Sequence, residues 1–135
     1  MPRLSAWMVR LSLVSLVLGA LVGGLLLAGV PVSAPHGAAL RQAHLDLMLF
    51  GWLVQFVLGV AYWMLPRYAA KPERGSPRLA WGAFALFQGG LALAVVGQAL
   101  ARPSIAPAAG RLLLAGATFV FLGLLWGRAK PFAAR

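Results

Sequence analysis

The chain has 135 residues, of which 61% are hydrophobic and 10% are charged, and its mean hydropathy is +0.86. A typical soluble domain is about 25% charged and about half apolar, so this composition excludes a soluble globular domain and a disordered chain. Cysteine is absent, which excludes disulfides, thiolate metal sites, iron–sulfur clusters and covalently attached c-type haem. The net charge of +10 does not indicate nucleic-acid binding, because the cationic residues flank apolar runs as they do in membrane proteins.

Four apolar segments are long enough to cross a bilayer core of about 30 Å, which requires about 20 helical residues. The sequence predicts transmembrane helices at about residues 7–30, 38–65, 79–101 and 108–127. The fourth helix reaches this length only if Arg111 extends its charged head outward to the membrane surface. Because the connections are too short for a further domain, we expect a single domain over residues 1–135. Its predicted fold class is all-α, an integral-membrane four-helix bundle.

The first segment has one alternative interpretation, a cleavable signal peptide, because residues 32–34 resemble a cleavage site. Its apolar run is longer than that of usual signal peptides, so we expect a retained helix.

Lysine and arginine lie unevenly on the two sides of the predicted helices. Nine of the twelve fall at the N-terminus, in the connection after the second helix, and at the C-terminus. The other three are Arg41, Arg102 and Arg111. The positive-inside rule then places both termini in the cytoplasm and the protein in the inner (plasma) membrane. The cationic loops would contact anionic lipid headgroups, which explains the high charge without a nucleic-acid partner.

Small residues recur at helical spacing on three of the predicted helices. They are Gly19 and Gly23 on the first, Gly82, Gly89 and Gly97 on the third, and Gly123 and Gly127 on the fourth. Such residues let helix backbones approach closely. We therefore expect them to pack helices together within the bundle or between chains.

The second helix carries the most informative face. At 100° per residue, six side chains fall on one side of it: His44, Met48, Gly51, Gln55, Gly59 and Tyr62. Its two glycines would admit either a flat cofactor or another backbone. Ionisable groups inside a membrane are functional candidates, and His44 is either a metal ligand or an interfacial, structural residue. Gln55 is expected to form a hydrogen bond between helices.

The other ionisable groups near this face do not form a site with His44. Asp46 points about 160° away from His44 on a helix, so it cannot orient that ring. It is either a proton-transfer group or the ion-pair partner of Arg41, Arg102 or Arg111. His36 lies about 12 Å from His44 along a helix, too far to share one metal ion. No hydrolytic or nucleotide-binding motif is present, so no catalytic residue is predicted.

Two runs in the second helix, His44-xxx-Met48-x-Phe50 and Gly59-xx-Tyr62-xx-Leu65-Pro66, carry a resemblance. They resemble the second transmembrane helix of subunit I of the haem–copper oxidase and nitric oxide reductase superfamily. In that family this helix runs from outside to inside, which agrees with the orientation from the Lys and Arg distribution. The resemblance is good over residues 37–67 and extends to the N-terminal four-helix portion of the subunit.

The resemblance implies a haem b site in which His44 is the ligand of the iron. Met48 and Gly51 would adjoin the cofactor on the same face, and Arg41, or Arg102 with Arg111, would pair with the haem propionates. Subunit I has about a dozen helices, and its other haem and copper ligands lie in helices that have no counterpart here. Two copies could therefore supply two His44 ligands to one haem, or His44 could pair with Met48 or Met64 of another helix. Met48 of the same helix cannot bind the opposite side of the same iron, because it lies one turn from His44.

Two functions from different classes follow from this resemblance. The leading hypothesis is a small membrane haem b protein that transfers electrons or binds a diatomic gas such as NO or O₂, as a homo-oligomer. The alternative is a non-catalytic accessory or assembly subunit of a larger respiratory oxidase or nitric oxide reductase. In neither case is the chain expected to be a complete enzyme on its own. A transporter or channel is a third possibility, but no broken helix or inverted repeat indicates one.

Overall fold

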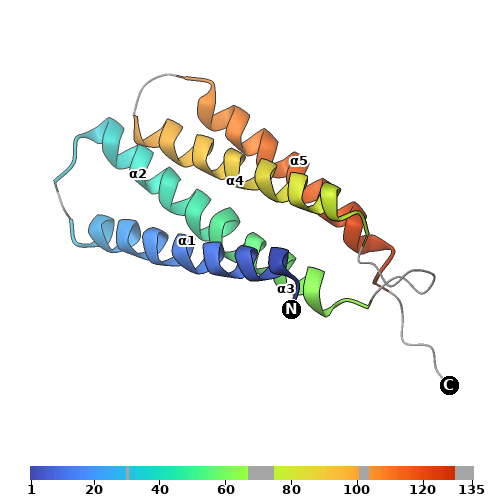
Figure 1. Cartoon of the computed structure of the whole chain (residues 1–135). Coiled ribbons are helices and arrows are strands. Elements are labelled where there is room, and N and C mark those ends of the chain that lie inside the picture. Colours follow the sequence, from blue (N-terminus) through green and yellow to red (C-terminus); the bar gives the residue numbers. More distant parts are fainter. Residues whose placement is uncertain (30, 67–74, 101–103, 130–135) are drawn as a thin grey trace.

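The computed structural model describes residues 1–29, 31–66, 75–100 and 104–129, and within these ranges it contains helices and no strand (Figure 1). The elements are α1 (Arg3–Leu27), α2 (Ala34–Asp46), the π-helical segment η1 (Leu47–Val54), α3 (Gln55–Met64), α4 (Pro77–Ala99) and α5 (Ala106–Trp126). Because α2, η1 and α3 are continuous, we call Ala34–Met64 the second span. The described part of the chain thus holds four helices that are long and apolar enough to cross a membrane. The predicted all-α membrane fold is confirmed.

Each helix begins two to four residues before its predicted start. The second span, α4 and α5 each carry a proline in their first turn, namely Pro35, Pro77 and Pro107. Proline suits this position because its missing N–H would have no helical partner there and its fixed φ already matches the helix. The apolar runs from which the starts were predicted begin only after these prolines. The cue for the start is therefore the proline and not the first apolar residue.

The second span is unusually long and has an irregular middle. Its 31 residues would extend about 46 Å at helical rise, more than the roughly 30 Å of a bilayer core. Either the span tilts or one end extends beyond the hydrocarbon. η1 occupies the centre, and π-helical turns of this kind often occur at functional sites.

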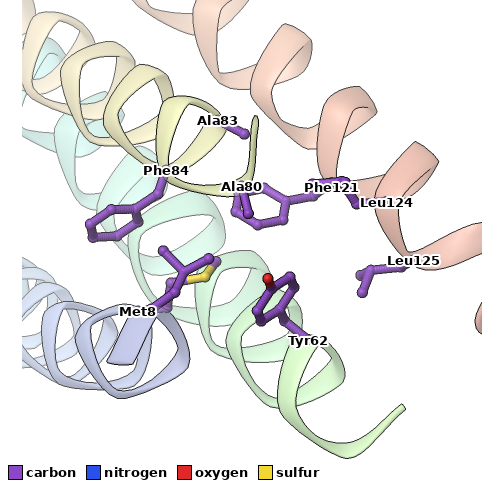
Figure 2. Close-up of a cluster of buried hydrophobic side chains, with 9 residues drawn as sticks. Met8, Tyr62, Ala80, Ala83, Phe84, Phe121, Leu124 and Leu125 are labelled. Carbon is purple, nitrogen blue, oxygen red and sulfur yellow. The ribbon is translucent and has the colours of Figure 1, made fainter. Parts of the chain in front are cut away.

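The helices pack in chain order: α1 lies along the second span, α2 lies along α4, and α4 lies along α5 (Figure 1). We call the end where α1 begins and α5 ends the terminal end, and the opposite end, where α1 leads to α2, the loop end. At the terminal end all four helices contribute to one buried apolar cluster (Figure 2). Its members are Leu4, Met8, Tyr62, Ala80, Ala83, Phe84, Phe121, Leu124 and Leu125. All four helices therefore meet in one cluster at the terminal end.

Glycine packing differs in part from the expectation. Gly19 and Gly23 do lie against the second span, as predicted. Gly82 and Gly89 of α4 and Gly123 of α5 have no neighbouring atom within 4 Å of an ideal Cβ, so they do not pack helices together within one chain. That they pack helices between chains stays a prediction.

The residues of α4 that lie against α5 are Gly90, Ala94 and Gly97, of which Gly97 was predicted. An ideal Cβ on Gly90 would lie 2.8 Å from the Gly110 carbonyl oxygen of α5, and one on Gly97 would lie 3.0 Å from Cδ of Pro107. The buried residues Phe87, Leu91 and Ala94 set which side of α4 faces inward, and this side includes Gly90 but not Gly89. The α4–α5 contact is therefore close backbone packing of the kind that small residues allow.

The neighbouring glycines of α4 provide a matched test of this seam. Gly90→Ala places a methyl group against the α5 backbone and should lower the free energy of unfolding by about 1–3 kcal/mol, as overpacking does. Gly89→Ala places the same methyl group in open space and should not destabilise the protein. Thermal unfolding in detergent, followed by helical circular dichroism, measures both. Equal melting temperatures for the two variants would contradict the assigned seam.

Candidate functional site

His44 of α2 is seated on two glycines of α1. Its Nδ1 lies 2.8 Å from the carbonyl oxygen of Gly19, and an ideal Cβ on Gly23 would lie only 2.7 Å from Cε1 of the ring. Because a carbonyl oxygen can only accept, Nδ1 must donate, and Nε2 then carries the free lone pair of the neutral ring. Metal-binding histidines show this arrangement, in which one ring N–H bonds to a carbonyl and orients the other nitrogen as a ligand.

His44 also lines an apolar hollow of about 480 Å³ between α1 and α2 at the loop end. The other lining residues are Ala20, Gly23, Gly24, Leu26 and Leu27. A hollow of this size and character lies within the range of small-molecule sites. The described residues provide no hydrogen-bond partner for Nε2, so a half-buried histidine lines the hollow with its lone pair unused.

The remaining side chains of the predicted cofactor face lie in the contact between α1 and the second span. An ideal Cβ on Gly19 would lie 2.8 Å from Sδ of Met48, and one on Gly51 would lie 2.8 Å from Oγ of Ser15. The space beside Gly51 is filled by the side chains of Ser15 from α1 and Leu91 from α4. The residues therefore fit a haem at Nε2 of His44 but not along the face that includes Met48 and Gly51.

Three further predictions concern neighbouring polar groups. Gln55 is fully buried, and its Nε2 donates to the Met8 carbonyl oxygen at 3.0 Å, so the expected hydrogen bond between helices is confirmed. His36 is exposed, and its Nδ1 lies 2.6 Å from Oγ of Ser33. Arg41 is exposed, three residues before His44. Among the described residues no group of three or more His, Cys, Asp or Glu could hold a metal ion.

Asp46 forms an ion pair with Arg111, one of the three partners considered for it. Nη2 and Nε of Arg111 donate to the two carboxylate oxygens at 2.9 and 3.2 Å, and the Asp46 side chain is only 3% exposed. The buried carboxylate needs a cation and hydrogen bonds to offset its lost hydration, and the Arg111 side chain that supplies them stays 34% exposed. That Arg111 extends outward to the membrane surface stays a prediction. The pair ties the second span to α5, and it leaves Arg111 engaged with Asp46.

Arg128 is a structural residue that the sequence reasoning counted only as a membrane-flanking charge. It is 1% exposed, and it donates to the carbonyl oxygens of Tyr62, Leu65 and Pro66 at 2.7–2.9 Å. Its guanidinium also lies 5.3 Å from the centroid of the Tyr62 ring. The last carbonyls of a helix have no partners within it, and a cation is favoured at that end. The sequence Leu65-Pro66 marks the end of the second span, whose last carbonyl oxygens need hydrogen-bond donors from elsewhere in the chain. This was the sequence signal that could have identified Arg128.

The Asp46–Arg111 pair is tested by removing each member alone and both together. Arg111→Gln leaves a buried carboxylate without its counter-charge, whereas Asp46→Asn leaves a guanidinium that is 34% exposed. We expect Arg111→Gln to lose about 3–5 kcal/mol of folding free energy, Asp46→Asn to lose less because water reaches the guanidinium, and the double variant to lose clearly less than the sum of the two. Melting temperatures in detergent measure the effects, with the exposed Arg41→Gln as the control that should not change. Additive losses in the double variant would show that the two side chains do not act as a pair.

The chain matches the family model of cytochrome c and quinol oxidase polypeptide I over residues 3–130. Comparison with curated proteins and with solved structures gave no match. The family match covers all four helices, including the second span with His44, and it agrees with the resemblance seen in the sequence of that span. The protein therefore belongs to the cytochrome c and quinol oxidase polypeptide I family.

Proposed function

We propose that this protein is a small haem-b-binding protein of the inner (plasma) membrane, in which Nε2 of His44 binds the haem iron. The observation that supports this most directly is the hydrogen bond from Nδ1 of His44 to the Gly19 carbonyl oxygen. It assigns the proton to one nitrogen and leaves the other as a ligand, next to an apolar hollow. Membership of an oxidase subunit I family supports haem as the group bound.

Each residue around the proposed haem has a separate role. The Gly19 carbonyl orients the His44 ring as a ligand. Gly23 provides the space in which the ring lies. Leu26 and Leu27 make the hollow apolar, which limits access of water to the iron and affects its redox potential. Arg41 and Arg111 are two of the arginines predicted to pair with the haem propionates. Arg111 forms an ion pair with Asp46, so Arg41 is the one proposed for this role among the described residues.

A haem b bound through one histidine supplies reversible one-electron chemistry or a position for a gas ligand. The sixth coordination position decides between them. A protein ligand there favours electron transfer, and an open position favours binding of NO or O₂. Both termini lie in the cytoplasm in this proposal, which follows the distribution of Lys and Arg. His44 then lies toward the outer side of the membrane.

A second candidate function is that of an accessory subunit of a larger respiratory oxidase or nitric oxide reductase. The observation that favours it is the set of glycines with no atom within 4 Å of an ideal Cβ on the outer sides of α4 and α5: Gly82, Gly89, Gly116 and Gly123. Small residues allow close approach of a further helix in a membrane. In this function the protein would bind no haem and would co-purify with a catalytic subunit.

The two histidines of the chain give a matched test of haem binding. His44→Ala removes the proposed ligand and should abolish the haem spectrum, whereas His36→Ala changes an exposed histidine and should retain it. The measurement is a reduced-minus-oxidised visible spectrum of protein purified in mild detergent, with haem per chain determined as the pyridine haemochrome. Retention of the full spectrum in His44→Ala would refute the assignment. A colourless wild-type protein from cells supplied with haem precursor would favour the accessory-subunit function.

A further inference from the structure

A second hollow at the loop end lies on the opposite side of α2 from the one that His44 lines. It measures about 580 Å³ and is formed by α2, α4, α5 and the residues just before α5. The two hollows have no lining residue in common. Binding of a ligand at this second hollow therefore does not depend on a haem at His44.

Four polar side chains line this hollow, and every one of them carries a hydrogen-bond donor. Gln42 comes from α2, Gln98 from α4, Ser104 from the residues before α5, and Arg111 from α5. Amides and hydroxyls donate through N–H or O–H, and a guanidinium carries five N–H donors and no acceptor. Within the part of the chain that the structure describes, no carboxylate lines the hollow. The lining therefore suits a ligand that is rich in acceptors.

Arg111 presents a fixed donor edge to the hollow. Its Nε and Nη2 donate to the two oxygens of Asp46 at 3.2 and 2.9 Å, so the ion pair holds the plane of the guanidinium. Nη1 lies on another edge of the group, and none of the described residues accepts a hydrogen bond from it. The Arg111 side chain is 34% exposed, whereas that of Asp46 is 3% exposed. The unused donors are therefore on the accessible side of the pair, and they are oriented before a ligand binds.

The charges at the loop end favour an anion. By their place in the sequence, Arg41, Arg102 and Arg111 belong to this end, and Asp46 is its one acidic residue. The other acidic residue of the sequence, Glu73, belongs to the connection that follows the second span at the terminal end. Two of the three helices that line the hollow also begin there, and a helix N-terminus favours negative charge. The hollow therefore lies in a region with an excess of positive charge.

The hollow lies at the level of a membrane surface. α5 has 21 residues, which extend about 31 Å at helical rise, close to the roughly 30 Å of a bilayer core. When α5 crosses the bilayer, its first turns, which line the hollow, lie at the level of the lipid headgroups. Leu100 and Ile105, which are close in sequence to lining residues, are 64% and 84% exposed. Acyl chains can cover such apolar side chains while a headgroup occupies the hollow.

We propose that this hollow is a phosphate site, in which the free donors of Arg111 and those of Gln42, Gln98 and Ser104 bind the oxygens of one phosphate group. Arginine suits phosphate because its planar edges offer parallel N–H donors. The phosphodiester of a lipid headgroup and free inorganic phosphate share this chemistry. The level of the hollow in the membrane and its exposed apolar neighbours favour the lipid.

The first test measures the melting temperature of the full-length protein, delipidated in mild detergent, with three added compounds. They are dioleoylphosphatidylglycerol, dioleoylglycerol, which has the same acyl chains without the phosphate, and inorganic phosphate against chloride at equal ionic strength. We expect saturable stabilisation by dioleoylphosphatidylglycerol and none by dioleoylglycerol, because a ligand stabilises the folded state that binds it. Equal stabilisation by inorganic phosphate would support the phosphate site and assign it to the free ion. An equal effect of dioleoylglycerol, or no effect of either phosphate compound, would overturn the proposal.

Two neighbouring residues of α4 give a matched test of the hollow itself. Gln98→Glu places a carboxylate in the lining, whereas Ala99→Glu places it on the next residue, which is exposed and lies outside the lining. Because like charges repel most strongly at short range, Gln98→Glu should weaken binding of dioleoylphosphatidylglycerol at least about tenfold, and Ala99→Glu should weaken it much less. Affinities come from titration of the melting temperature with the lipid. Equal affinities of the two variants would contradict the assigned site.

Arg111→Lys separates the phosphate site from the ion pair with Asp46. Lysine retains a counter-charge for the buried carboxylate, but it is a point charge without a second donor edge. We expect this variant to keep its helical circular dichroism and to lose at least about tenfold in affinity for dioleoylphosphatidylglycerol. A folded Arg111→Lys protein that binds the lipid as tightly as wild type would overturn the proposal. If this variant does not fold, the comparison of Gln98→Glu with Ala99→Glu decides, because it leaves the ion pair intact.

Discussion

The close approach of α1 to the second span is the contact on which the site depends. Gly19 and Gly23 bring the two backbones near enough for the His44 ring to lie against α1 and for Nδ1 to reach the Gly19 carbonyl oxygen at 2.8 Å. One hydrogen bond then decides the tautomer, the ring orientation and the nitrogen that stays free. A side chain at Gly23 would collide with the His44 ring. A substitution that changes the packing of α1 on the second span would therefore also displace the proposed ligand. The same contact continues toward the terminal end through Met48, Gly51 and Gly59 of the second span.

The buried charges hold this arrangement at both ends of the bundle. Near the loop end, Asp46 and Arg111 link the second span to α5 in a bidentate pair. At the terminal end, Arg128 follows α5 and binds the last carbonyls of the second span. Hydrocarbon cannot satisfy a charged or a free backbone group, so each such group must find its partner inside the protein. The Asp46–Arg111 ion pair and the hydrogen bonds of Arg128 therefore link α5 and the residues that follow it to the second span, which carries His44.

The family match and the contacts around His44 concern the same four helices. The family match extends from the first helix to the end of the fourth, and the histidine of the second span lies in a seat formed within these four helices alone. The hollow that His44 lines is formed by α1 and α2, and α5 supports the second span through the Asp46–Arg111 pair.

Composition and apolar length by themselves determined the membrane class, the number of helices and the face of the second span that carries His44, Gly51 and Gln55. These are local properties, because the bilayer requires about 20 apolar residues per span and helical periodicity assigns residues to faces. Only the tertiary structure decided what covers that face, which arginine neutralises Asp46, and that Gly90 instead of Gly89 contacts α5. Each of these depends on the rotation of one helix against another, and residues far apart in the chain set that rotation. For the same reason Arg128 could be read from the sequence as a charge at the membrane surface, although it is a buried cap for a helix that ends 64 positions before it.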